Sequence, residues 1–334
     1  MTDRQTSNCI KGIAAVMIML GHITSGMPLW IRALFSGDLW VGIFFFYSGF
    51  GLITSLRGKG AEYLDGFLLK KIRGIWLPFI IAESIYTLVY IAMNGFTDVS
   101  VVDVILGCLG LRLYNSVLWY VDELMVMNII FFVWYRCIKS DKRFGRVPVD
   151  FLIWPILYVV FLACGVLFDI GTWWYISTST FVIGILCGEL RAYKSAHTTA
   201  NAATDVWHKS ISIRIIALIL FIIAYAAYRY LGLAYTGDAI FGVPINYLLT
   251  AMSMLLVPWF VWSIDILVGL LDPKVVVNKV TAFLGSVSYD IYLYHGLLIL
   301  IVNHYIFNIL LCPLLVLVGT LLVAAAIRAV SRRA

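Results

Sequence analysis

Long apolar segments recur along almost the whole chain, and short polar segments separate them. Most of them are close to the roughly 20 residues that an α-helix needs to cross the hydrocarbon core of a bilayer. A shorter apolar stretch, 99–111, is too brief to cross and is predicted to be an interfacial or re-entrant helix. The pattern therefore predicts an all-α fold, a polytopic membrane helical bundle of about ten transmembrane helices, at residues 9–28, 39–56, 74–93, 118–137, 151–168, 174–191, 211–231, 244–268, 284–304 and 308–328.

Composition supports the membrane assignment. Of the 334 residues, 62% are hydrophobic and 13% are charged, whereas a soluble domain carries about 25% charged residues. We expect one membrane domain over residues 1–334, with no appended soluble domain. The net charge of +6 does not indicate a nucleic-acid partner, because the cations gather at the ends of the apolar segments. The six cysteines show no CxxC spacing and are predicted to be small buried apolar residues.

The positive charges predict the orientation in the membrane. If the N-terminus is cytoplasmic, the inner segments hold all of the 24 lysines and arginines except Arg32, Arg112 and Arg229. This is the bias of the positive-inside rule, and it predicts cytoplasmic N- and C-termini in a multi-pass protein of the plasma membrane. The first apolar segment is too long for a signal peptide and no A-x-A site follows it, so we expect it to remain.

Ionisable residues inside apolar segments are costly and indicate function. His22 is the most informative of them, because it follows Lys11 by eleven residues, which returns an α-helix to within about 20° of the same face and places the two about 16 Å apart along the axis. A hydrogen bond to a neighbouring helix would contribute only about 0.6 kcal/mol on average, a small return for burying an imidazole. The other candidates of this kind are Glu83, Asp122, Glu123, Asp290 and His295.

A cationic cluster precedes the third predicted helix. Lys70 and Arg73 are three residues apart, on one face of a helix, and Lys71 lies between them. Together with Lys11 they are suited to holding phosphates at the cytoplasmic rim. Membrane orientation and binding to lipid headgroups explain the same cluster without a ligand.

The predicted outer segments contain aromatic, amide and acidic side chains. Aromatic faces beside carboxylates and amides suit a carbohydrate, and aromatic residues equally form the belt at a membrane interface. The paired acids are harder to explain by a belt. His197 and His208 are predicted to be loop residues, and no metal site is expected. The residues of the outer segments are Arg112, Tyr114, Asn115, Trp119, Tyr120, Asp122, Glu123, Trp173, Trp174 and Tyr175.

Five motifs, in this order, resemble the integral-membrane acyltransferase-3 family over the whole chain. The resemblance implies transfer of an acyl group, commonly acetyl, from cytoplasmic acyl-CoA to a hydroxyl of a cell-envelope saccharide or a related acceptor. Two positions depart from the family pattern, because Lys11 and Lys70 stand where arginine is common; lysine keeps the charge but loses the bidentate geometry. The motifs are Lys11-x10-His22, Phe44–Phe50, Lys70-x2-Arg73 with the following Pro78, Trp119-Tyr120 and Ser288–His295.

The resemblance and the residues together give a mechanistic hypothesis. His22 is expected to act as general base on the acceptor hydroxyl, since a sugar hydroxyl is a weak nucleophile; an acyl-histidine intermediate is the variant. Lys11, Lys70 and Arg73 are expected to bind acyl-CoA, a co-substrate, with no bound cofactor. The sequence gives no clear oxyanion donor, and Ser48, Tyr47 and Tyr292 are candidates. Possible acceptor-binding or supporting residues are Ser48, Glu83, Trp119, Tyr120, Asp122, Glu123 and His295.

Two other functions fit parts of the pattern. A proton-coupled membrane transporter would use His22, Glu83 and His295 as a relay, but the chain shows no internal symmetry of the kind that such carriers often have. A non-catalytic scaffold leaves the buried histidine unexplained.

Overall fold

The computed structural model describes residues 3–95, 99–138, 143–144, 147–168, 171–197, 211–234, 239–240, 243–306 and 311–331. These residues are almost entirely helical, apart from two antiparallel hairpins with two residues in each strand, β1 (Arg143–Phe144) with β2 (Val147–Pro148) and β3 (Ala239–Ile240) with β4 (Val243–Pro244). His197, which we interpreted as a loop residue, is instead the last residue of the helix Ser179–His197. His208, which we also interpreted as a loop residue, lies outside the described residues.

The described residues contain eight helices that are long and apolar enough to cross a membrane. A ninth arises if α15 (Lys279–Ser286) and α16 (Ser288–Tyr305), which meet at an angle of 71°, form one broken span. The predicted all-α polytopic membrane bundle is therefore confirmed. The eight are Arg4–Ile23, Ile31–Leu64, Phe67–Asn94, Ser116–Ile138, Asp150–Leu167, Ile211–Gly232, Ile245–Leu270 and Leu311–Val330.

The span count differs from about ten mainly at the predicted segment 174–191. Here the chain forms a short helix, α9 (Trp173–Ile176), followed by α10 (Ser179–His197). α10 has 19 residues, close to the length of a span, but its second half carries three charged residues, the acid Glu189 and the bases Arg191 and Lys194. These charges remove it from the set of sufficiently apolar helices.

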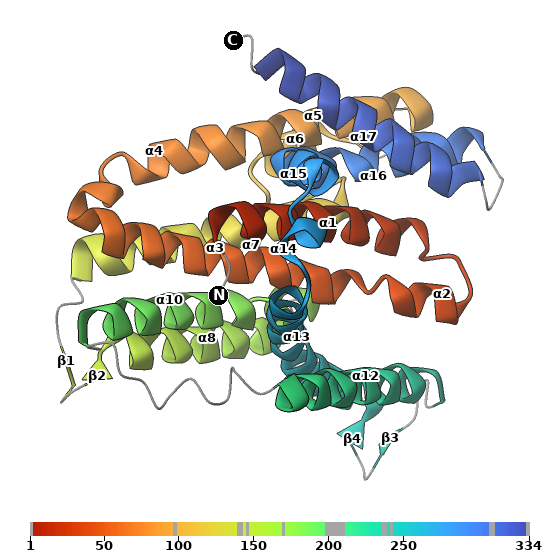
Figure 1. Ribbon diagram of the computed structural model, residues 1–334. Helices are drawn as coiled ribbons and strands as arrows, with labels where there is room; N and C mark the ends of the chain where they lie inside the picture. The colour runs from red at the N-terminus through yellow and green to blue at the C-terminus, as the bar shows by residue number, and fades with distance from the viewer. Residues whose placement is uncertain are drawn as a thin grey trace. The chain divides into compact units, whose positions relative to one another are not determined.

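The chain divides into two compact units, each made of three separate segments. Unit 1 consists of Met1–Ile10, Asp38–Gly60 and Lys142–Lys279. Within it, α12 packs along α13, and α10 contacts both α8 and α13 (Figure 1). Its further helices are α3 (Gly37–Lys59), α8 (Asp150–Leu167), α12 (Ile211–Ala234), α13 (Ile245–Leu270) and α14 (Pro273–Val276).

A buried ionic cluster ties three helices of unit 1 together. Arg57, near the end of α3, donates from Nε and Nη2 to the Glu189 carboxylate of α10 at 2.7–3.1 Å. Its Nη2 also donates to Asp150, the first residue of α8, at 3.1 Å. The two carboxylate side chains are only 5% and 0% exposed, so the guanidinium is what makes their burial tolerable.

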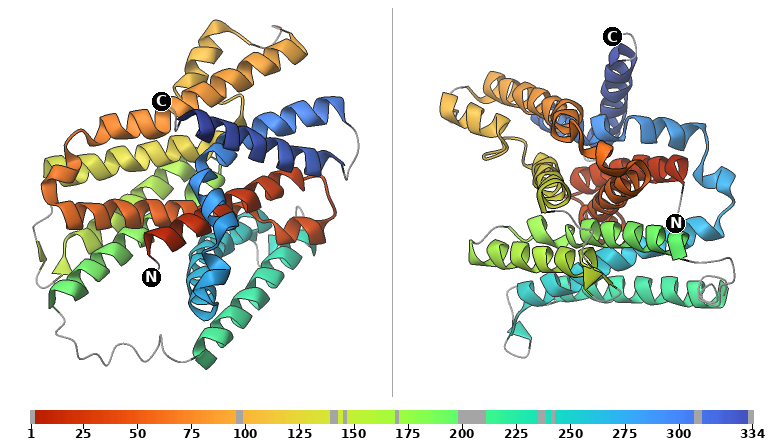
Figure 2. Two further views of the ribbon diagram at one scale, coloured as in Figure 1. Left: turned by 45° about the horizontal axis from the view of Figure 1, so that its top comes forward. Right: turned by 90° about the vertical axis from the view of Figure 1, so that its left-hand side faces the viewer.

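Unit 2 consists of Lys11–Gly37, Ala61–Asp141 and Val280–Ala334. The long helices α16 and α17 are in close contact with each other (Figure 2). α5 packs against both α6 and α16. Its elements are most of α1 (Arg4–Ile23), α2 (Leu29–Leu34), the 3₁₀ turns η1 (Gly60–Leu64) and η3 (Ser116–Leu118), the π turns η2 (Ile72–Trp76) and η4 (Trp134–Ile138), and the helices α4 (Phe67–Lys71), α5 (Leu77–Asn94), α6 (Val101–Cys108), α7 (Trp119–Val133) and α17 (Leu311–Ser331).

α1 runs unusually close to the break between α15 and α16. A Cβ atom at Gly12 would collide with the backbone of Leu284 and Gly285. Only glycine permits this approach. The close contact fixes the part of α1 that begins with Lys11 against the last turn of α15, which directly precedes the helix that carries His295.

Candidate functional site

Two histidines from distant parts of the sequence face each other in unit 2. His22 lies at the C-terminal end of α1, and His295 lies in α16. Their ring centroids are 5.3 Å apart and the rings are inclined by 30°. His22 is half-buried, whereas His295 is 0% exposed. Both residues are candidates from the sequence, but no sequence pattern predicts that they lie close together.

The protein backbone selects the tautomer of His295. Its Nδ1 lies 2.7 Å from the carbonyl oxygen of Tyr292 and 3.2 Å from that of Ile291. A carbonyl only accepts, so Nδ1 carries a hydrogen, and in the neutral ring Nε2 then carries the lone pair. In the described part of the chain, the buried Nε2 has no hydrogen-bond partner.

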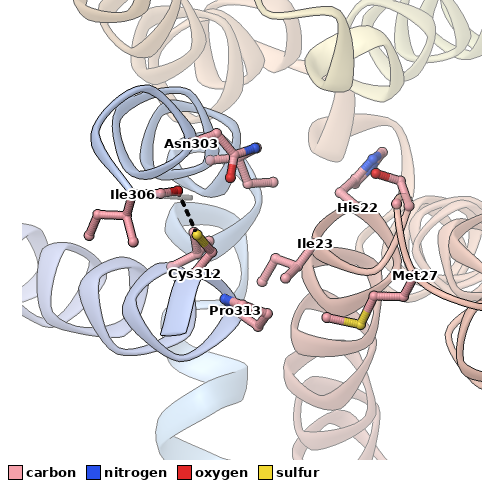
Figure 3. A pocket seen from close by; sticks show the side chains of 11 residues that line it. His22, Ile23, Met27, Asn303, Ile306, Cys312 and Pro313 are labelled. Atoms are coloured by element: carbon pink, nitrogen blue, oxygen red, sulfur yellow. Dashed lines mark hydrogen bonds between the residues drawn. The ribbon is translucent and has the colours of Figure 1, made fainter. Parts of the chain in front are cut away.

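His22 lines two cavities in unit 2. The first has a volume of about 450 Å³, and Figure 3 shows His22, Ile23 and Met27 on one wall and residues of α16 and α17 on the facing wall. The second, of about 470 Å³, is lined by more hydroxyl, amide and imidazole side chains, and is called the polar cavity below. His22 is therefore placed where two chemically different spaces come together. The second cavity is lined by His22, Ser25, Tyr86, Asn115, Ser116, Val117, Gly296, Ile299, Leu300, Asn303 and His304.

Glu83 holds the loop that forms one side of the polar cavity. Its Oε1 accepts hydrogen bonds from the backbone N–H groups of Tyr114 and Asn115, at 2.7 and 3.4 Å. Glu83 is 1% exposed. The sequence analysis proposed Glu83 as a supporting or relay residue, and its hydrogen bonds favour the supporting function.

The Ser288–His295 motif attaches α16 to two other elements through its tyrosines. The hydroxyl of Tyr289 donates to the carbonyl of Ile75 in the π turn η2 at 2.7 Å. The hydroxyl of Tyr292 donates to the carbonyl of Val117. Tyr292 therefore uses its donor to position the loop, which argues against its predicted use as an oxyanion donor.

The Trp119-Tyr120 pair begins α7, as the sequence predicted. Trp119 is half-buried, and Tyr120 is 3% exposed. The Tyr120 ring makes an edge contact with Tyr292, with 5.4 Å between centroids. Tyr120 therefore packs against Tyr292 of α16, and neither residue of the Trp119-Tyr120 pair lines the two cavities around His22.

Asp122 and Glu123 lie in the first turns of α7 and are 5% and 0% exposed. Both oxygens of the Asp122 carboxyl lack a hydrogen-bond partner among the described residues. The N-terminal end of a helix favours acidic side chains. Neither acid lines the two cavities, so their predicted contact with an acceptor stays a prediction.

The predicted cationic site contains one residue that the sequence analysis did not select. Lys70 is exposed and donates to the Asp65 carbonyl at 3.0 Å, and Arg73 is exposed in η2, where the α-helical spacing is interrupted. Lys71 is half-buried, lies over the Phe67 ring at 5.2 Å and interacts electrostatically with Lys11. Two cations drawn into one region favour an anion there.

Ser48 and Tyr47 lie on α3 in unit 1, whereas both cavities around His22 belong to unit 2. Their predicted roles stay predictions. Asp290 is half-buried and interacts electrostatically with Arg328.

The fold and the site define a polytopic membrane protein with a histidine pair beside two cavities. Its sequence matches the acyltransferase domain over residues 5–329, and the chain therefore belongs to the integral-membrane acyltransferase-3 family. No curated protein and no solved structure matches the chain at a significant level. The protein is a membrane acyltransferase.

Proposed function

We propose that the protein transfers an acyl group, most simply acetyl, from cytoplasmic acyl-CoA to a hydroxyl of a cell-envelope saccharide or related acceptor at the plasma membrane. The observation that carries the proposal is the position of His22, which lines two cavities, one with few polar side chains and one with many. An acyl chain suits the first cavity, and a hydroxylated acceptor suits the second. The reacting atoms would meet at the imidazole.

His22 acts as the general base in this proposal. Its imidazole takes the proton from the acceptor hydroxyl while the hydroxyl oxygen attacks the thioester carbonyl carbon. The new C–O bond forms, the C–S bond breaks, and the imidazolium returns the proton to the departing thiolate. The products are an O-acyl ester and free CoA thiol, so neither an oxidant nor a cofactor is required.

The cations at the other end of α1 supply the donor site. Lys11 and His22 lie in one continuous helix, α1, and their separation of eleven residues corresponds to about 16 Å. Lys11 and Lys71 would hold the CoA phosphates as point charges, with Lys70 and Arg73 at the entrance. The flexible arm of the donor would then reach along α1 to His22.

A proton-coupled transporter is the second candidate. It would require a relay through His22, Glu83 and His295. The hydrogen bonds of Glu83 to the loop backbone and the family assignment both favour the transferase.

Labelled acetyl-CoA and purified protein in lipid nanodiscs test the proposal. We expect saturable binding of the donor and release of CoA thiol only when a hydroxylated saccharide acceptor is added. Mass spectrometry of envelope glycans from cells with and without the gene would identify the acyl group and the acceptor together. Proton-driven uptake of a solute, without any binding of acyl-CoA, would contradict the proposed transferase function and support a transporter.

A further inference from the structure

Asn115 carries an unused hydrogen-bond donor beside the histidine site. Its side chain lines the polar cavity that His22 also lines, and the residue is 2% exposed. In the described part of the chain, its Nδ2 has no hydrogen-bond partner. A buried amide donor without a partner is destabilising, and such groups persist where a ligand supplies the missing acceptor.

The surrounding structure holds this amide in place from two sides. Glu83 accepts a hydrogen bond from the Asn115 backbone N–H. On the other side, the carboxamide lies against Gly296, where a Cβ atom would be 2.9 Å from Nδ2 and even closer to Oδ1. Gly296 directly follows His295. The position of the Asn115 amide is thus coupled to the helix that carries the second histidine.

We propose that Asn115 is the oxyanion donor of the transfer reaction, an inference that rests on the proposed function. As the acceptor oxygen bonds to the thioester carbon, the electron pair of the C=O bond moves onto the carbonyl oxygen. Nδ2 of Asn115 donates a hydrogen bond to that oxygen while the negative charge is present. When the carbonyl re-forms, the C–S bond breaks and the thiolate leaves.

A donor of this kind acts strongly because it is already oriented and lies out of water. Tyr292, another candidate, is less suitable, because its hydroxyl donates to the Val117 carbonyl. Asn115 combines burial, an unpaired donor and a shared cavity with His22.

The decisive variant is Asn115→Asp, which keeps the shape of the side chain against Gly296 but replaces the amide donor by oxygen. We expect kcat for acyl transfer to fall by about 10²–10³-fold, the usual effect of removing an oxyanion donor, while the Kd of acyl-CoA stays unchanged. The ratio of variant to wild-type kcat should rise as the pH is lowered, because a protonated carboxyl regains an O–H donor. A merely structural defect would not give this pH dependence.

Asn128→Asp is the matched control. Asn128 is also buried in unit 2, at 1% exposed, but its Nδ2 already donates to the Leu124 carbonyl at 2.6 Å and it lines neither cavity. Loss of this donor should leave kcat within a few-fold of wild type in the folded fraction. Gly296→Ala, which displaces the Asn115 carboxamide without changing it, should lower kcat in the same direction as Asn115→Asp.

The outcomes separate this inference from the proposed function. If wild-type protein transfers acyl groups and Asn115→Asp does so with an unchanged kcat, the oxyanion assignment is wrong while the transferase stands. Equal losses of kcat in Asn115→Asp and Asn128→Asp would also overturn it. Absence of transfer by the wild type would overturn the proposed function and this inference together.

Discussion

The imidazole of His22 lies 5.3 Å from that of His295 between ring centroids, although 272 residues separate the two in the sequence. The two rings are not equivalent. His22 lines both cavities, whereas His295 lines neither and has Nδ1 bound to the backbone of its own helix. Under the proposed function, this asymmetry favours His22 as the histidine that contacts substrate, with His295 as its neighbour.

The first prediction concerns His22. His22→Gln should lower kcat for acyl transfer by about 10²–10⁴-fold, the usual contribution of a general base. Donor binding should remain, because the cations proposed for the CoA phosphates lie toward the other end of α1. Isotope-labelled transfer assays and equilibrium binding of acyl-CoA measure the two effects separately. Transfer at the wild-type rate would exclude His22 from the chemistry.

The second prediction distinguishes Lys71 from Lys70. Lys71→Gln should raise the Kd of acyl-CoA about tenfold or more, since a hydrogen bond to a charged group contributes about 1.5–3 kcal/mol. Lys70→Gln should have a smaller effect, because Lys70 is exposed and donates to the Asp65 carbonyl. Binding titrations at two ionic strengths provide the measurement. A larger loss of acyl-CoA affinity in Lys70→Gln than in Lys71→Gln would instead support Lys70, the residue of the sequence motif, as the main contact to the donor.

The third prediction concerns the ionic cluster of unit 1. Arg57→Met removes the shared partner of two buried carboxylates and should cost about 3 kcal/mol, the lower end of the range for breaking a buried pair, since the Arg57 side chain is 32% exposed. Thermal unfolding of the purified protein in detergent measures the loss. Arg136→Met is the control, because its pair with Asp65 is exposed on both sides and is expected to contribute at most about 1 kcal/mol. Equal stability losses in the two variants would contradict the assignment.

The fourth prediction is a pH dependence at the start of α6. A hydrogen bond from the Ser100 hydroxyl, together with the Ser100 backbone N–H and the Arg112 guanidinium, holds the pKa of the Asp103 carboxyl below its usual value. A lowered pKa stabilises the folded state above the unfolded value of about 3.9, and this stabilisation disappears as the pH falls through the lower folded value. The protection factors of α6 amides, which correct the exchange rates for the pH dependence of intrinsic amide exchange, should therefore be lower at about pH 3 than at pH 6. In Asp103→Asn this difference should be absent.

Much of the fold followed from hydrophobic patterning, because segment length and charge are local properties of the sequence. The start of α7 at Trp119 and the short α6 were predicted for this reason. The span count was less accurate at α10, where Glu189 and Arg191 occupy the last turns of an otherwise apolar helix. The break before α16 was not predicted, since its residues Ser286 and Ser288 lie within an apolar stretch that reads as one span.

The site was predictable only in part, because a cavity depends on which helices meet. His22 and His295 each stood out as ionisable residues in apolar segments, but their proximity depends on the packing of α1 against α16. Asn115 did not stand out among the polar residues of a predicted outer segment. Its significance comes from burial and from an unpaired donor, neither of which has a sequence signal. Lys71 was not among the predicted acyl-CoA-binding residues, because the family motif contains its neighbours Lys70 and Arg73.

The last prediction decides what Glu83 does. If Glu83 positions the Tyr114–Asn115 loop through its Oε1, Glu83→Gln should retain most of the transfer activity, because a glutamine carbonyl oxygen accepts the same backbone hydrogen bonds. Glu83→Ala should lower kcat by about tenfold or more, because the backbone N–H groups of the loop lose their acceptor and Asn115 is no longer held in position. A proton relay through Glu83 predicts a different result. Glutamine cannot exchange a proton, so Glu83→Gln would then lose as much activity as Glu83→Ala. Transfer assays on the two variants, with folding verified by thermal unfolding, therefore separate a positioning residue from a relay residue at a single site.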